Sequence, residues 1–245
     1  MLLFYNIGKY LLLLKTIFSR PENAKILVKR TFYEVNSIGV ESLGIISMIS
    51  IFMGMVTTIQ SAYQLVSPLI PRSVLGSVVS DSSLLEFSTT VSALVLAGRV
   101  GSNISSELGN MKISEQIDAL EVMGINSANY LILPKIIGGL IAIPLLVIIS
   151  AFLCLAGGIF IGNYTGVVSA NDFIDGARET FKTFTLVFAM IKAFTFAFII
   201  TSVSAYQGFF VKGGSLEVGK ASTRAVVHSC IFILIFDYLL AQLLL

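Results

Sequence analysis

The sequence predicts an all-α membrane protein with about five transmembrane helices, an N-terminal interfacial helix and a cytoplasmic coupling helix. Of the 245 residues, 56% are hydrophobic and only 12% are charged. The mean hydropathy of +0.91 is too high for a soluble domain of this length. A helix needs about 20 apolar residues to cross a bilayer, and five stretches have that length: 38–66, 84–105, 129–162, 183–207 and 225–245. We expect them to form one domain over 1–245.

The N-terminal segment 1–36 is predicted to lie at the membrane surface. Its first apolar run is interrupted by Asn6, Lys9 and Lys15 and is expected to form an interfacial helix that ends near Arg20 and Pro21. A second amphipathic segment continues to about Glu34. The alternative, a sixth span, would place Lys9 and Lys15 in hydrocarbon at a large energetic cost. Residues 37–245 then form the transmembrane bundle. Its third stretch contains Pro134 and Pro144, so a tilted or kinked helix is expected there.

The distribution of basic residues predicts the orientation of the chain. The segment before the first span and the loop between the fourth and fifth carry most of the cations: Lys9, Lys15, Arg20, Lys25, Lys29, Arg30, Lys212, Lys220 and Arg224. The opposite loops hold only Arg72, Arg178 and Lys182. The positive-inside rule therefore places the N-terminus in the cytoplasm and the C-terminus on the far side of the membrane.

The connector between the second and third spans is predicted to form a coupling helix over 106–125. An apolar stripe of Ile113, Ile117 and Leu120 lies beside an acidic face of Glu115, Asp118 and Glu121. Surface helices that bind anionic lipid usually carry Lys and Arg, so an acidic helix favours a protein partner. We also expect Arg99 to pair with Glu107 or Glu121 and so hold this helix to the second span.

At these residues the sequence resembles a known family. The run AGRVGSxxxxELGxMxxxEQIDALEVMG over residues 97–124, the following Tyr130, Leu131 and Pro134, and STRAVVHS from Ser222 to Ser229 are similar to the signature of MlaE/YrbE permeases. These are the membrane subunits of ABC transporters that move phospholipid between bacterial membranes. The chain departs from the pattern at Ser88, Thr89 and Thr90, where a Gly-Pro pair is common, and in its last residues.

The resemblance implies partners and a location. It implies docking on a cytoplasmic ABC ATPase that binds ATP and Mg²⁺, a periplasmic lipid-binding protein with an MCE domain, phospholipid as cargo, and the bacterial inner membrane. ATPase coupling is expected from Glu107, Glu115, Ile117, Asp118, Leu120 and Glu121. It also implies that Glu86 faces a lipid cavity at its outer end, although an acidic residue in a first helical turn needs no such role.

Two ionisable residues, Lys192 and Asp237, fall near the middle of predicted spans, where a charge costs about 2.5–3.5 kcal/mol. They could form a buried ion pair that fixes helix packing. They could instead line, with Glu86, a polar path for a lipid headgroup.

Enzymatic chemistry within this chain is not expected. The sequence lacks the phosphate-binding loop G-x-x-x-x-G-K-[ST], and no nucleophile elbow or metal-ligand cluster is evident. Cys154 and Cys230 are expected to be small core residues, and the single His228 to be hydrogen-bonded at the interface. We expect no cofactor in this chain and no nucleic-acid partner.

The sequence is best interpreted as a permease subunit that works as a homodimer, because five crossings enclose a two-tailed lipid with difficulty. Gly158, Gly162 and Gly166 permit close helix contact, within one chain or between two. Two alternatives remain: an ion-coupled secondary transporter that uses Lys192 and Asp237 as a relay, and a membrane scaffold that transports nothing.

Overall fold

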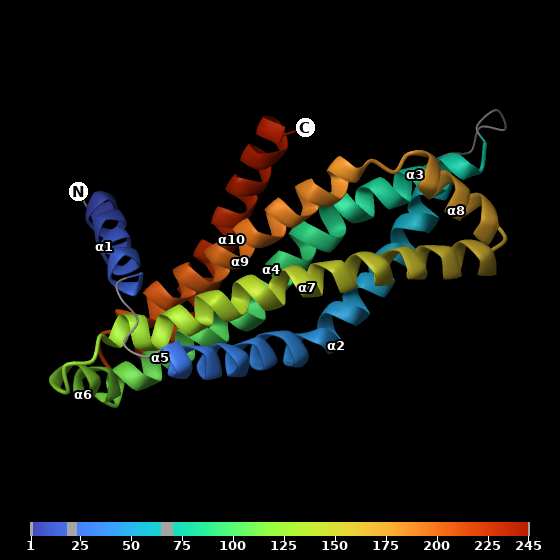
Figure 1. The fold of residues 1–245 in the computed structure, drawn as a ribbon. Helices are drawn as coiled ribbons and strands as arrows, with labels where there is room; N and C mark the ends of the chain where they lie inside the picture. The colour runs from blue at the N-terminus through green and yellow to red at the C-terminus, as the bar shows by residue number, and fades with distance from the viewer. Residues whose placement is uncertain (1, 19–23, 65–70, 245) are drawn as a thin grey trace. The chain divides into compact units, whose positions relative to one another are not determined.

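The computed structural model describes residues 2–18, 24–64 and 71–244, and these are helical, with no β-strand among them. Figure 1 follows the helices from the N-terminus to the C-terminus. In chain order they are α1 (Leu2–Ile17), α2 (Ala24–Gln64), α3 (Ser73–Ser82), η1 (Ser83–Val91), α4 (Ser92–Leu96), η2 (Ala97–Gly101), α5 (Ser102–Ile113), α6 (Gln116–Val122), α7 (Ser127–Tyr164), α8 (Ala170–Glu179), α9 (Thr183–Phe209) and α10 (Ser215–Leu244).

Five helices of the described chain are long and apolar enough to cross a membrane, which confirms the expected number. They are Ala24–Gln64, Ser73–Ile113, Ser127–Tyr164, Thr183–Phe209 and Ser215–Leu244. The second of these runs through α3, η1, α4, η2 and α5 and contains the two π-helical segments η1 and η2. Turns of this rare type occur frequently at functional sites.

The N-terminal segment differs in part from the prediction. Helix α1 is separate and, at 16 residues, is not among the five candidate spans. The amphipathic segment after it is no independent element, because α2 begins at Ala24 and continues into the first span. No proline interrupts residues 24–64, so nothing in the backbone ends the helix before the apolar stretch. The expected end of α1 near Arg20 and Pro21 lies outside the described residues.

The chain divides into two compact units, which are described separately. The first comprises Met1–Ser42, Leu94–Ile143 and Thr195–Phe236, and the second comprises Leu43–Ala93, Pro144–Phe194 and Asp237–Leu245.

In the first unit, α1 is fixed to the start of α7. The side-chain amides of Asn126 and Asn129 donate to the carbonyl oxygens of Thr16 and Ile17, at 3.3 and 2.6 Å. These are carbonyls of the last helical turn, which have no partner within their own helix. The amides therefore cap the C-terminal end of α1.

In the second unit, α3 and α8 lie side by side because glycines allow their backbones to touch. A Cβ atom added to Gly76 would lie 2.2 Å from the carbonyl oxygen of Phe173, and one added to Gly176 would lie 1.8 Å from that of Ser73. Helix α8, which the sequence analysis did not predict, begins at a capping serine: the hydroxyl of Ser169 accepts from the backbone N–H of Asp172 at 3.1 Å.

Two of the glycines noted in the sequence, Gly158 and Gly162, allow close packing inside the second unit. A Cβ on Gly158 would lie 2.8 Å from the Thr58 hydroxyl oxygen, and one on Gly162 would lie 2.7 Å from Val168. Gly166 is different, since it has φ +70° and lies in the turn after α7.

The connector is two helices instead of one continuous helix over 106–125. Helix α5 ends at Ile113, and α6 begins at Gln116. Between them Glu115 has φ 59°, a left-handed conformation that is uncommon for a residue with a side chain. This residue turns the chain sharply, and neither Gly nor Pro marks the turn in the sequence.

Candidate functional site

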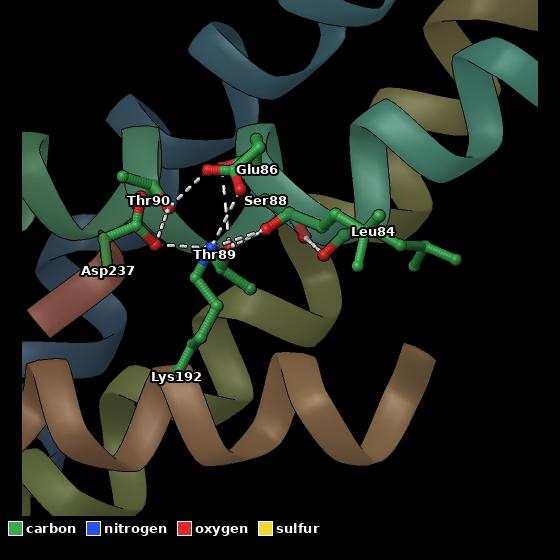
Figure 2. Close-up of polar contacts among 8 residues, drawn as sticks. Leu84, Glu86, Ser88, Thr89, Thr90, Lys192 and Asp237 are labelled. Atoms are coloured by element: carbon green, nitrogen blue, oxygen red, sulfur yellow. Dashed lines mark hydrogen bonds and ion pairs between the residues drawn. The ribbon is translucent and has the colours of Figure 1, made fainter. Parts of the chain in front are cut away.

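The structure brings together the three ionisable residues that the sequence analysis placed on a substrate path. The Nζ atom of Lys192, on α9, lies 2.5 Å from Oδ1 of Asp237 on α10 and 3.2 Å from Oε1 of Glu86 on η1. All three belong to the second unit. Figure 2 shows the lysine reaching between the two carboxylates. Glu86 is therefore a direct partner of Lys192, which the sequence did not indicate.

Two further polar groups complete this site, which we call the charged cluster (Glu86, Thr90, Lys192, Asp237 and the carbonyl of Leu85). Lys192 donates to the carbonyl oxygen of Leu85 at 2.7 Å. The hydroxyl of Thr90 lies 3.0 Å from Oε2 of Glu86 and 3.1 Å from Oδ1 of Asp237 (Figure 2). The sequence analysis noted Thr90 only as a departure from a family pattern. Its spacing of four residues from Glu86 on a helix was the signal that could have found it.

Burial in the charged cluster is uneven. The side chain of Lys192 is fully buried, that of Asp237 is 18% exposed, and that of Glu86 is 47% exposed. Two carboxylates around one ammonium leave a net charge of minus one when all three are ionised. A buried ammonium in an apolar bundle is tolerable only when it is paired and hydrogen-bonded. The cluster therefore joins η1, α9 and α10, and Glu86 is its most accessible part.

Serine hydroxyls form a second set of polar contacts between helices of the same unit. The hydroxyl of Ser150 on α7 lies 2.8 Å from that of Ser50 on α2 and 2.9 Å from that of Ser92 on α4. The thiol of Cys154 donates to the Ser83 hydroxyl at 3.2 Å. These contacts satisfy buried polar groups between helices, and Cys154 is the buried core residue that was expected.

Several residues expected to couple to an ATPase make contacts within the chain instead of forming the predicted apolar stripe and acidic face on the surface. Ile117 is fully buried, and Leu120 is partly buried. Of the acidic residues, Asp118 pairs with Lys112 at 2.5 Å, and Glu121 accepts from the Ser127 hydroxyl at 2.7 Å. These contacts lie within the first unit and hold α6 in place.

The exposed part of the connector includes Glu115 and Glu121 of the predicted acidic face, together with apolar residues that the sequence analysis did not name. Glu115 is exposed at the turn before α6, and the apolar side chains of Val122 and Met123 are 88% and 65% exposed. Sequence periodicity missed these two because the predicted stripe assumed an unbroken helix.

Arg99 does not pair with Glu107 or Glu121, which corrects the expectation from the sequence. It donates to the Ser42 hydroxyl at 2.6 Å and to Oε2 of Glu41 at 3.2 Å. The expectation considered only charges near the connector, whereas α2 supplies the nearer partners.

Glu107 instead belongs to an ion triad that the sequence analysis missed. The Nζ atom of Lys135 on α7 lies 2.7 Å from Oε1 of Glu34 on α2 and 2.7 Å from Oε2 of Glu107 on α5. The lysine side chain is 3% exposed. Three helices of the first unit are thus joined at the end of the bundle where the connector begins.

Among the described residues, no group of three or more His, Cys, Asp and Glu side chains is placed to hold a metal ion. The His228 ring is hydrogen-bonded to Gln207, with 3.0 Å between Nδ1 and Nε2.

Comparison with known proteins identifies the family. The family model "Permease MlaE" matches residues 31–243. A "Probable ABC transporter permease protein" of Rickettsia bellii is 33% identical over 97% of this chain and 92% of its own length. The "Intermembrane phospholipid transport system permease protein MlaE" of Haemophilus influenzae is 30% identical over 95% of this chain and 89% of its own length.

A plant relative extends the comparison. The chloroplast protein TRIGALACTOSYLDIACYLGLYCEROL 1 of Arabidopsis thaliana is 34% identical over 89% of this chain and 62% of its own length. Together with the five candidate spans and the match of the family model to most of the sequence, these similarities show that the chain belongs to the MlaE family of ABC transporter permeases.

Proposed function

We propose that this chain is the membrane subunit of an ABC transporter that moves phospholipid between the inner and outer membranes of a bacterial envelope. The observation that carries the proposal is the charged cluster, because a fully buried lysine with two acidic partners stands among helices that are otherwise apolar. Intramembrane charges of this kind mark transport paths. The phospholipid cargo is supported by the similarity to the phospholipid transport permease of Haemophilus influenzae.

The chemistry of the charged cluster fits a phospholipid headgroup. The phosphate of the headgroup can replace a carboxylate as the partner of Lys192, and an amine or hydroxyl can bind to Glu86. Because Glu86 is the accessible member, it would meet the headgroup first, and Lys192 would follow as η1, α9 and α10 separate. Because the lipid phosphate replaces a carboxylate as the partner of Lys192, the ammonium group has a negatively charged partner at each stage.

Energy for this movement is proposed to come from a separate ATPase that binds ATP and Mg²⁺ and docks on the connector. The exposed Val122 and Met123 offer an apolar contact, and Glu115 offers an adjacent negative charge. Buried Ile117, together with the pairs made by Asp118 and Glu121, holds α6 rigid beneath that surface. A rigid docking element transmits movement to α5 and α7, between which it lies in the chain.

A second copy of the chain is proposed to complete the cavity. Only 11% of the apolar window of α10 is buried within one chain, compared with 61% for α9. The exposed apolar side chains of α10 include Phe232, Ile235 and Leu239. They supply a surface that a symmetric partner can cover. We propose, from the distribution of basic residues, that the N-terminus lies in the cytoplasm and the C-terminus in the periplasm, where an MCE-domain protein would receive the lipid.

The test is reconstitution of the permease with its ATPase in vesicles that contain a fluorescent phospholipid. Transfer of the lipid to acceptor vesicles should require ATP hydrolysis and should fail with Lys192→Met. Transfer that follows a proton or sodium gradient without ATPase would support the ion-coupled transporter instead. Full function after loss of each charge, with normal folding, would support a scaffold.

A further inference from the structure

Two serine hydroxyls of the first unit are buried at a helix contact without a hydrogen bond. Ser105 on α5 and Ser204 on α9 are both 0% exposed. Their Oγ atoms have no hydrogen-bond partner among the described residues. A buried hydroxyl without a partner has lost its bonds to water and gained none in return. Such groups are rare in folded proteins, so two of them at one contact require a physical explanation.

The two serines alternate with glycines along the contact between the second span and α9. A Cβ atom added to Gly101 of η2 would lie 2.7 Å from Oγ of Ser204, and one added to Gly208 would lie 2.5 Å from the carbonyl oxygen of Ser105. Gly101 therefore faces Ser204, and Ser105 faces Gly208. Both pairs advance by four residues, so the two helices run in the same direction with matched turns.

The next turn of the second span also holds a glycine. A Cβ atom on Gly109 would lie 3.4 Å from Cγ2 of Val211, just beyond the end of α9. The contact thus has small residues at intervals of four on both helices: Gly101, Ser105 and Gly109 on the second span, and Ser204 and Gly208 on α9. Small residues let helices approach closely, and they leave no large side chain that interlocks the two surfaces.

A shift of α9 by one turn towards its C-terminus, about 5.4 Å, joins the two hydroxyls. Ser204 would then face Ser105, and Gly208 would face Gly109. Either hydroxyl can donate to the other. Ile200 would take the place of Ser204 opposite Gly101, and its Cγ2 atom already lies 4.0 Å from the Cβ position of that glycine.

Two neighbouring segments of the first unit fit this shift. A Cβ atom on Gly139 of α7 would lie 2.4 Å from Cγ2 of Thr201, and the shift replaces Thr201 there by the smaller Ala197. After α9, the chain continues through Gly213, which has φ +114°, and Gly214, where an added Cβ would meet nothing within 4 Å. Small residues at the end of a helix can absorb the change in backbone dihedral angles that a helix movement requires.

We propose that the second span and α9 have two registers one helical turn apart, and that Ser105 and Ser204 hydrogen-bond to each other in the second register. Displacement of one element past another by a helical turn is a known form of conformational switch. The two serines are therefore positioning residues for this movement. The inference rests on the proposed function only for its trigger, the binding of ATP by the partner ATPase, because α5 leads directly into the connector.

The first test traps the present register with a disulfide in the assembled complex. The Cβ position of Gly101 lies 3.9 Å from Cβ of Ser204, within the range of about 3.5–4.5 Å for a disulfide. Gly101→Cys/Ser204→Cys, with Cys154 and Cys230 replaced by alanine, should oxidise readily without nucleotide. ATP bound before oxidation to an ATPase that cannot hydrolyse it should lower the disulfide yield at least about fivefold. An unchanged yield would overturn the inference.

The matched control joins the second span to α10 instead of α9. The hydroxyl oxygens of Ser106 and Ser222 lie 2.7 Å apart. The disulfide yield of Ser106→Cys/Ser222→Cys in the same cysteine-free background should not respond to ATP. An equal fall in this yield would show a general opening of the unit and would refute a shift confined to α9.

The second test measures the register itself and needs no lipid transport. Spin labels at Asn110→Cys on α5 and Phe198→Cys on α9 report the separation of the two helices along their length. ATP should produce a second population in which the labels are closer by about 5 Å, the rise of one helical turn. A single distance with and without ATP would contradict the proposal. A complex that shows the shift yet moves no lipid would refute only the proposed function.

The third test removes the hydroxyls from the spin-labelled complex. Ser105→Ala and Ser204→Ala should not lower the melting temperature, because neither hydroxyl is bonded in the present register. Each should reduce the shifted population about two- to tenfold, the effect of one hydrogen bond, and the double variant should lose no more than either single variant. Ser229→Ala is the control, since its hydroxyl is equally buried and has no partner among the described residues. A full shift in Ser105→Ala or Ser204→Ala would overturn the role of these hydroxyls.

Discussion

Replacement of Lys192 by Met should destabilise the protein more than any other single change in the charged cluster. The change leaves Asp237, which is 18% exposed, without its cation. Removing one partner of a buried ion pair costs about 3–5 kcal/mol. The pair with half-exposed Glu86 adds under about 1 kcal/mol, because solvent screens it. We therefore expect a loss of about 3–6 kcal/mol in the free energy of unfolding.

Replacing the acidic partners should lower the free energy of unfolding by less, and the loss should be larger for the more buried partner. Asp237→Asn leaves Lys192 with Glu86 and the Leu85 carbonyl, so the loss should be about 1.5–3 kcal/mol, the value of a hydrogen bond to a charged group. Glu86→Gln should cost less than about 1 kcal/mol. In the Lys192→Met/Asp237→Asn double variant, the loss should fall short of the sum of the single losses by about 1–3 kcal/mol.

The assay is unfolding in mixed micelles together with folded yield, ATPase activity and lipid transport of the assembled complex. Lys182→Met, an exposed cation of the same unit, is the matched control and should be neutral. Equal losses for Lys192→Met and the control would refute the argument from burial. Recovery of yield and transport in the double variant would assign the pair to packing, and normal yield with lost transport in each single variant would assign it to the lipid path.

Further changes test other contacts. Gly176→Ala should destabilise the α3 and α8 pair, because its Cβ would collide with the backbone of α3, whereas Gly44→Ala meets nothing within 4 Å and should be neutral; thermal melting compares them. Val122→Asp should weaken ATPase binding at least about tenfold in a pull-down titration, because Val122 is an exposed apolar contact, and unchanged binding would place docking elsewhere. Lys135→Met should lower the melting temperature because it leaves two carboxylates facing each other, and an unchanged temperature would show that the triad contributes nothing. Thr90→Val should cost about 1 kcal/mol or more of unfolding free energy, and Thr90→Ser should restore it.

The sequence predicted the fold because composition and length determine membrane spans almost alone. Five apolar stretches became five long helices, and the fourth begins at Thr183 as expected. The ends were harder to place, since α2 and α10 continue for ten or more residues beyond the apolar core. Helix propensity does not change at the membrane surface, so hydropathy marks where the lipid ends and not where the helix ends.

The charged cluster was predictable in part for a related reason. Lys192 and Asp237 could be identified from the cost of charge in hydrocarbon, whereas partners far apart in sequence could not. Glu107 and Lys135 are 28 residues apart, and both lie near helix ends where a charge needs no explanation. Ile117 was assigned to a docking stripe because the turn at Glu115 has no Gly or Pro to reveal it.

Thr90 shows how a departure from the family pattern acquires a role. Its hydroxyl has one hydrogen and two carboxylate acceptors within reach, Glu86 at 3.0 Å and Asp237 at 3.1 Å. It can donate to only one of them at a time. The charged cluster therefore has two arrangements, one in which Thr90 donates to the more accessible carboxylate of Glu86 and one in which it donates to the more buried carboxylate of Asp237. Under the proposed function, a headgroup that bound Glu86 would replace Thr90 as its hydrogen-bond partner and would favour donation from Thr90 to Asp237. Asp237 would then keep a partner as Lys192 turns towards the lipid phosphate.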